Sequence, residues 1–358
     1  MSAGALGFKH FGFSFGYLSK RISTSLLILT KGLKVSLVIN NCKRLTWSET
    51  LVNEIIECIP NFSTSNPAVV DTILNEIRSV RNVWLLDHTY DNYYNRLVVS
   101  YVGNRNSVLT ATLNSAIKAI QLIDMNKHKG QHPRVGAVDV VPFVPIRNVA
   151  IEDCVDLAKR FGETLAKRCN IPVYLYGEAA STPERSDLDW IRLGEYEKLG
   201  EMIRKPERKP DFGPSRPHPT AGATLTGARK VMVGFNVNLG TSDLRVAKKI
   251  AKALHSRKGG LTFVKAMAAK IPERNITQIG MSISDFEKTP VYRVFELIKI
   301  EAERYGVPVI GSEFCGLAPL RVITDAAGYY LKIDDFDEDR VLEVAVQKAV
   351  EKGRRESG

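Results

Sequence analysis

The chain has 358 residues, 44% of them apolar and 25% charged, so it holds enough apolar side chains for one large core or two smaller ones. This composition excludes an intrinsically disordered chain and a collagen-like repeat. At about 100–200 residues per domain, the length favours two domains. No apolar run reaches the roughly 18 residues of a membrane span, because the best candidate, 22–39, is interrupted by Lys31, Gly32 and Lys34. We therefore expect a soluble protein with no membrane partner.

The net charge of +11 is concentrated at the N-terminus. Residues 1–50 contain seven Lys and Arg and one acid, a net charge of +6, and residues 51–358 carry the remaining +5. The main part of the chain therefore gives little support to nucleic-acid binding, which needs a basic stripe and exposed aromatic side chains. Residues 1–50 resemble an organelle transit peptide in composition, but they show neither an amphipathic period nor a cleavage signal. We interpret them as an extension outside the fold and expect a cytoplasmic protein, with organelle targeting as the alternative.

The five cysteines show no regular spacing and no C-x-x-C pair. This pattern argues against a disulfide framework and against a cysteine-based zinc site. It indicates a reduced, intracellular compartment.

Taken in chain order, residues 54–176 alternate between strand and helix patterns. The expected strands are 54–59, 83–87, 97–102, 138–144 and 173–176. The expected helices are one that begins at Pro67, then 108–123 and 151–169. The polar segment 88–96 is expected to form the loop between the second and third strands. The order β-α-β-β-α-β with a further α-β predicts a ferredoxin-like layer.

Residues 181–222 break this pattern, because six prolines fall there and only 191–203 has a helical stretch. We interpret this segment as a linker or a long functional loop. A second α/β unit follows, with expected strands at 230–237, 276–283 and 307–310 and expected helices at 244–254, 291–305 and 341–352. The predicted fold class is α/β (α+β), with two ferredoxin-like α/β subdomains at 51–230 and 231–358 packed with a cleft between them.

The densest polar cluster is H-K-G-Q-H-P-R at 128–134. Two histidines four residues apart could share a helix face as metal ligands, but Gly130 and Pro133 argue against a helix. No third ligand is evident, so we expect no metal. In a loop, a histidine beside Lys129 and Arg134 suits an acid/base group near an anion-binding patch, because its pKa lies near neutrality. A surface histidine in a solvated basic turn is the alternative.

The polar segment 88–96 is a second candidate, because α/β proteins often place sites at strand ends. An ordinary hairpin loop is the alternative. The glycines of 222–230 resemble those of a P-loop, but the segment lacks the Gly-Lys-Ser/Thr ending. With no G-x-G-x-x-G fingerprint either, we expect no nucleotide chemistry.

Several segments together resemble the formiminotransferase domain family, also called glutamate formimidoyltransferase. The resemblance runs from about Glu54 to Gly328 and includes both predicted halves, whereas residues 1–50 match nothing in the family. The matching motifs are E-C-I-P-N-F-S at 57–63, L-L-D at 85–87, N-R at 95–96, L-I-D-M at 122–125, H-K-G-Q-H-P-R at 128–134, V-Y-L-Y-G-E-A-A at 173–180, P-D-F-G-P at 210–214, T-G-A-R-K at 226–230, F-N-V-N at 235–238 and G-L-A-P-L at 316–320.

The resemblance implies an enzyme that moves a formimidoyl group between N5 of tetrahydrofolate and the amine of L-glutamate, in histidine degradation and one-carbon metabolism. It also implies a homodimer. Larger animal members carry a following cyclodeaminase domain, for which this chain ends too early. Formyl transfer to glutamate on the same site, or a non-catalytic folate-binding protein, are the alternatives.

The resemblance also implies site residues. The catalytic histidine is the second one of the H-K-G-x-H-P-R motif, His132. The folate-binding stretch is Gly213, Pro214, Ser215, Arg216, Pro217, His218, Pro219, Thr220, Ala221 and Gly222. From their charge rather than from the resemblance, we take Lys129, Arg134, Arg229 and Lys230 as candidates for binding the carboxylates of glutamate and of a folate tail, with solvated basic residues as the alternative. Asn95 and Arg96 are further candidates for substrate contacts.

Asp91 looks like the acid of the D-x-x-x-N-R pattern of microbial relatives, and we expect it to orient or ionise His132. Animal members carry an aspartate where this chain has Thr89, which leaves the acid partner open. The implied reaction resembles acyl transfer. The glutamate amine attacks the amidinium carbon, and His132 shuttles a proton toward the departing N5, without a metal or a covalent enzyme intermediate.

Overall fold

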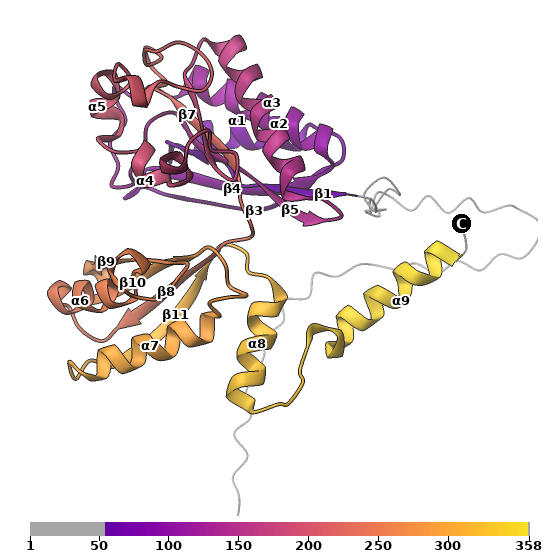
Figure 1. Cartoon of the computed structure of the whole chain (residues 1–358), viewed down its shortest axis with the longest axis vertical. Helices are drawn as coiled ribbons and strands as arrows, with labels where there is room; N and C mark the ends of the chain where they lie inside the picture. The colour runs from indigo at the N-terminus through magenta and orange to yellow at the C-terminus, as the bar shows by residue number, and fades with distance from the viewer. Residues whose placement is uncertain (1–53, 357–358) are drawn as a thin grey trace, which may run out of the picture. The chain divides into compact units, whose positions relative to one another are not determined.

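The computed structural model describes residues 54–356, so the prediction of an N-terminal extension at 1–50 lies outside the described residues. The described chain forms two α/β subdomains, each with its own sheet (Figure 1). None of its described helices is both long enough and apolar enough to cross a membrane. The predicted fold class is therefore confirmed, and the predicted cleft between the subdomains stays a prediction.

The first subdomain contains one mixed sheet and a set of helices. Its strands are β1 (Ile55–Cys58), β2 (Asn61–Phe62), β3 (Val83–Asp91), β4 (Arg96–Gly103), β5 (Val138–Arg147), β6 (Val173–Gly177) and β7 (Thr224–Ala228). Its helices are α1 (Pro67–Arg78), α2 (Arg105–Leu122), α3 (Ile151–Cys169), α4 (Leu188–Ile191) and α5 (Glu195–Met202).

The strand order of this sheet is that of a ferredoxin-like layer with an extension. Strands β1 and β2 both lie between β4 and β5 and pair antiparallel with each, while β3 pairs with the outer side of β4. Pro60 separates β1 from β2 because it has no N–H to donate, although its carbonyl still accepts from Val99 at 3.1 Å. On the other side of β5, strand β7 runs parallel to both β5 and β6. The predicted β-α-β-β-α-β order is confirmed.

Helices α1, α2 and α3 lie side by side over this sheet (Figure 1). Helix α1 begins where the sequence predicts, because the Asn66 side chain accepts from the Ala68 N–H at 3.0 Å and Pro67 occupies the first turn. The apolar face of α1 is buried, as its spacing predicts. The core beneath these helices contains Phe143 and Phe161, whose rings pack edge to face with centroids 6.0 Å apart.

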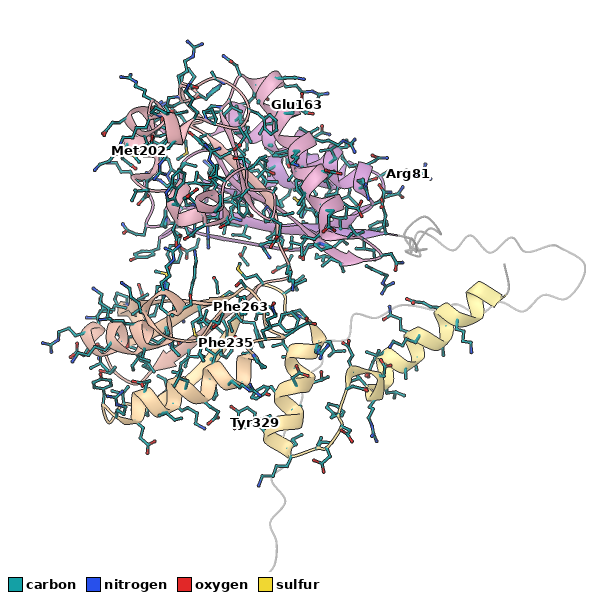
Figure 2. The ribbon with its side chains drawn as sticks, viewed as in Figure 1. Arg81, Glu163, Met202, Phe235, Phe263 and Tyr329 are labelled. Carbon is teal, nitrogen blue, oxygen red and sulfur yellow. The ribbon has the colours of Figure 1, made fainter. Side chains whose placement is uncertain are left out.

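The second subdomain repeats the same order of elements. It contains β8 (Val233–Leu239), α6 (Leu244–Leu254), β9 (Val264–Ile271), β10 (Ile276–Ile283), α7 (Val291–Glu303) and β11 (Val309–Cys315), followed by α8 (Leu320–Leu331) and α9 (Leu342–Glu356). The sheet order is β11-β8-β10-β9, entirely antiparallel. Helices α6 and α7 pack on one face around a core that includes Phe235, which is labelled in Figure 2.

The prediction of a long loop at 88–96 is wrong. The β3–β4 pairing continues to Asp91 opposite Arg96, so only the four residues 92–95 connect the two strands. Strand β3 lies at the edge of the sheet, where polar side chains can face water along its whole length. Its polarity therefore reflects an exposed strand and not a loop.

Other elements were not predicted. Strand β7 lies inside the segment that resembles a P-loop and is buried along its whole length. Its Thr and Gly residues give it no apolar strand pattern, so it was not predicted. Strand β9, rich in Ala and Lys, is held by its pairing with β10, and α8 follows Pro319. Two predicted strands were misplaced, since β8 begins at Val233 and β11 continues to Cys315.

Candidate active site

The predicted catalytic segment and the predicted folate-binding stretch are held together by backbone hydrogen bonds. The Met125 N–H donates to the Thr220 carbonyl at 2.7 Å, and the Ala137 N–H donates to the Ala221 carbonyl at 2.9 Å. The stretch closes on itself, because His218 and Gly222 exchange backbone hydrogen bonds of 2.9 and 3.2 Å. Two segments about ninety positions apart in the sequence thus form one surface of the first subdomain.

Glycine at position 136 is required for this contact. Gly136 pairs with Gly222, and a Cβ atom at position 136 would lie 2.0 Å from the Ala223 carbonyl oxygen. We expect Gly136→Ala to lower the free energy of unfolding by about 1–3 kcal/mol, because the two segments must separate. Urea denaturation would measure this. Gly200→Ala is the matched control, because Gly200 lies in helix α5 and a Cβ atom there would meet only the Pro217 ring, at 4.0 Å. Equal losses of stability in the two variants would contradict the prediction.

His132 lies in the loop between α2 and β5 and is bound directly to Arg96 on β4. The His132 Nε2 and Arg96 Nη1 atoms are 2.5 Å apart. A guanidinium can only donate, so Nε2 carries no proton and accepts. A second hydrogen bond joins the ring to the backbone of Pro133, which has no N–H and can only accept. The proton of the neutral ring therefore lies on Nδ1.

The environment of His132 strongly disfavours its protonated form. Burial, followed by the positive charges of Arg96 and Arg192, lowers the pKa of His132 from 6.5 to about 3. Burial and the charge of Arg192 also lower the pKa of Arg96. His132 is therefore a neutral imidazole at physiological pH.

The lowered pKa of His132 makes the free energy of unfolding decrease at acid pH. Between pH about 3 and 6.5 the unfolded chain binds a proton at His132 that the folded chain does not, so the free energy of unfolding falls as the pH decreases through this window. We expect His132→Asn to lose this contribution, so its stability should fall less steeply than that of the wild type between pH 7 and 4.5. Urea denaturation at several pH values would measure both slopes, and equal slopes would contradict the prediction.

Arg134 is engaged by carboxylates of its own subdomain. Its Nη2 lies 2.6 Å from Glu197 Oε1 and its Nη1 lies 2.9 Å from Glu195 Oε2, and the side chain is only 8% exposed. Its Nε donates to His128 Nδ1 at 3.3 Å, so His128 Nε2 carries the proton and donates to the Asn95 carbonyl at 2.9 Å. Arg134 thus ties α5 to the catalytic segment, and its predicted contact with substrate stays a prediction.

The other predicted residues have varied surroundings. Asn95 uses its side chain to join three loops, since Oδ1 accepts from the Ser65 N–H and hydroxyl at 2.9 Å and Nδ2 donates to the Lys129 carbonyl at 2.9 Å. Asp91 accepts from the Tyr94 N–H at 2.8 Å, a turn contact, so its role as acid partner of His132 stays a prediction. Lys129 is exposed on the wall of an open cavity of about 780 Å³, which Pro217 of the predicted folate-binding stretch also lines.

The sequence prediction missed a buried ion pair beside His132. Asp139, the second residue of strand β5, is 2% exposed, accepts from the Val135 N–H at 2.8 Å and pairs with Arg192 at the end of α4. One small recess is lined by Phe62, Ser63, Tyr94, Asn95, Arg96, His128, His132, Arg134 and Asp139. A lone aspartate in an otherwise apolar strand was the signal for Asp139; no local pattern marks Arg192.

Comparisons with known proteins match both subdomains to one family. Residues 55–229 match the formiminotransferase domain, N-terminal subdomain, and residues 234–351 match the formiminotransferase domain. The chain belongs to the formiminotransferase family. It is 44% identical to a glutamate formimidoyltransferase of Streptococcus pyogenes over 79% of this chain and 95% of that protein. It is also 44% identical to a glutamate formimidoyltransferase of Thermoplasma acidophilum, over 82% of this chain and 98% of that protein.

Longer family members share the same region. The chain is 42% identical to a mouse formimidoyltransferase-cyclodeaminase over 83% of its own length, but this match covers 57% of the mouse protein. The family resemblance predicted from sequence motifs is therefore confirmed. The roles of the individual site residues stay predictions.

Proposed function

We propose that this family member is a glutamate formimidoyltransferase, which transfers a formimidoyl group between L-glutamate and N5 of tetrahydrofolate. One observation carries the proposal: relatives of that name are matched at 44% identity over nearly their whole length. Tetrahydrofolate is the proposed co-substrate, with residues 213–222 as its proposed binding stretch. The resemblance implies a homodimer, and we propose a cytoplasmic location.

His132 is the proposed acid/base group. Amine exchange at a formimidoyl carbon passes through a tetrahedral adduct, in which the attacking nitrogen must lose a proton and the departing nitrogen must gain one. A neutral imidazole can accept the first proton and deliver the second. The 780 Å³ cavity beside His128 offers Lys129 as a cation for a substrate carboxylate. Holding both substrates next to His132 would supply the rest of the acceleration.

An absorbance assay of folate product formation tests the proposal. Purified protein would receive 5-formimidoyl-tetrahydrofolate with glutamate, or N-formimidoyl-L-glutamate with tetrahydrofolate, and 5-formyl-tetrahydrofolate in a parallel reaction. Turnover of the formimidoyl substrates supports the proposal. Turnover of the formyl donor alone would establish the related transfer, and folate binding without any turnover would leave a binding protein.

A further inference from the structure

Neither ring nitrogen of His132 is free to accept a proton in this structure. The Nε2 lone pair accepts the N–H of Arg96 at 2.5 Å, and the hydrogen bond to the Pro133 carbonyl occupies Nδ1–H. General-base catalysis needs an unshared lone pair within reach of the substrate. The geometry therefore describes a resting arrangement, and Arg96 must leave Nε2 before His132 can act.

Arg96 itself is a largely enclosed cation without a carboxylate. Its remaining contacts are a 3.3 Å hydrogen bond to the neutral Asn61 Oδ1 and the ring of Tyr94, whose centroid lies 5.9 Å away. No ion pair to Arg96 occurs among residues 54–356. The charge of Asp139 acts on Arg96, but the Asp139 carboxylate is bound to Arg192. Arg96 therefore has no carboxylate hydrogen-bonded to its guanidinium, and this position favours an incoming anion.

The charged groups around the pair have partners of their own. Asp139 on β5 is bound to Arg192 from the end of α4. Arg134 is bound to Glu195 and Glu197 of α5, and His128 is hydrogen-bonded to Arg134 and the backbone of residue 95. Asp139 acts on Arg96 through its charge, but none of these groups gives Arg96 a hydrogen-bonded carboxylate.

We propose that the α-carboxylate of the amino-acid substrate releases the base, by binding Arg96 and drawing its guanidinium away from His132 Nε2. The inference rests on the proposed function. A carboxylate offers two charged oxygens to a guanidinium, a stronger partner than one imidazole nitrogen. The α-carboxylate is also two bonds from the reacting amine, whereas the carboxylates of folate lie beyond a benzoyl ring from N5.

The proton then follows a closed path. The glutamate amine forms a bond to the formimidoyl carbon, and the nitrogen of the adduct becomes positively charged. Its proton passes to His132 Nε2, giving imidazolium, and the same proton passes to N5 of the folate as the C–N5 bond breaks. His132 ends as it began, and no further reactant is consumed. Pairing Arg96 with a carboxylate also removes a positive charge that opposes the imidazolium.

Nitrogen NMR of the wild-type protein tests the proposal without requiring turnover. The chain has six histidines, and the His132 signals would be assigned by their loss in His132→Gln. In the free protein we expect a neutral ring protonated on Nδ1, titrating near pH about 3. Saturating L-glutamate should raise this titration by at least about one pH unit, and the α-amide of glutamic acid should not. No rise with glutamate, or an equal rise with the α-amide, overturns the proposal.

Variants at Arg96 give an independent measurement. We expect Arg96→Gln to raise the His132 titration before any ligand is added, after which glutamate adds nothing. Arg96→Lys keeps a cation and should lie between this variant and the wild type. Arg81→Gln is the matched control, because Arg81 is exposed on the same subdomain (Figure 2) and its loss should leave the titration unchanged. An Arg96→Gln titration equal to that of the wild type overturns the proposal.

Kinetics separate this inference from the proposed function. We expect Arg96→Gln to raise KM for glutamate by about 10- to 150-fold, the range for losing a hydrogen bond to a charged group. The α-amide of N-formimidoyl-L-glutamate should show a lower kcat as well as a higher KM, because it leaves His132 bound to Arg96. If no formimidoyl group is transferred but glutamate still shifts His132, the proposed function fails while release by a carboxylate stands. If transfer proceeds but glutamate does not shift the His132 titration, the proposed function stands and release by a carboxylate fails.

Discussion

Replacing His132 with glutamine is expected to lower kcat about 10²- to 10⁴-fold, the range for removing a positioned acid/base group. Glutamine retains a hydrogen-bond acceptor for Arg96 but cannot carry a proton between two nitrogens. Folate binding should change little, because the predicted binding stretch is joined to the His132 loop through backbone atoms, at Met125 and Ala137. The absorbance assay and a folate-binding titration measure the two quantities separately.

His88→Gln is the control for this substitution. His88 is exposed on β3, opposite Val99 in the sheet, so its replacement should leave turnover near the wild-type level. If His132→Gln kept more than a tenth of wild-type turnover, His132 would not be the group that moves the proton. Such a result would direct attention to His128, the other histidine of the same segment.

Replacing Asp139 with alanine is expected to lower the free energy of unfolding by about 3–5 kcal/mol, because it leaves a buried guanidinium without its partner. The side chains of Asp139 and Arg192 are 3% and 13% exposed, and Asp139 also accepts the Val135 N–H. The double variant Asp139→Ala/Arg192→Met should recover part of the loss, since it removes the uncompensated charge as well. Urea denaturation measures all three proteins.

Glu163→Ala provides the matched control for a broken ion pair. Glu163 and Lys167 form an exposed pair one turn apart on α3, and Glu163 lies at the surface in Figure 2. Exposed helix pairs contribute about 0.3–0.5 kcal/mol, so this variant should be nearly as stable as the wild type. A loss in Asp139→Ala no larger than in Glu163→Ala would mean that Arg192 finds another partner or reaches water.

The sequence by itself determined the family, the ferredoxin-like order of the first half and its helices α1, α2 and α3. Helix α1 is an example: Asn66 and Pro67 specify its start and its apolar spacing specifies its buried face, so all the information is local. The motif at 128–134 was equally visible, because its glycine and proline exclude a helix and leave a polar loop.

The tertiary structure alone decided which elements pair and which charges meet. Strand β7 has a weak local pattern, and only its position between β5 and β6 makes it a strand. The same holds for the site, because Arg96 on β4, His132 in a loop and Arg192 after α4 have no fixed spacing in the sequence. Their contact sets the protonation state of His132, since burial and neighbouring charge depend on distances that only folding defines.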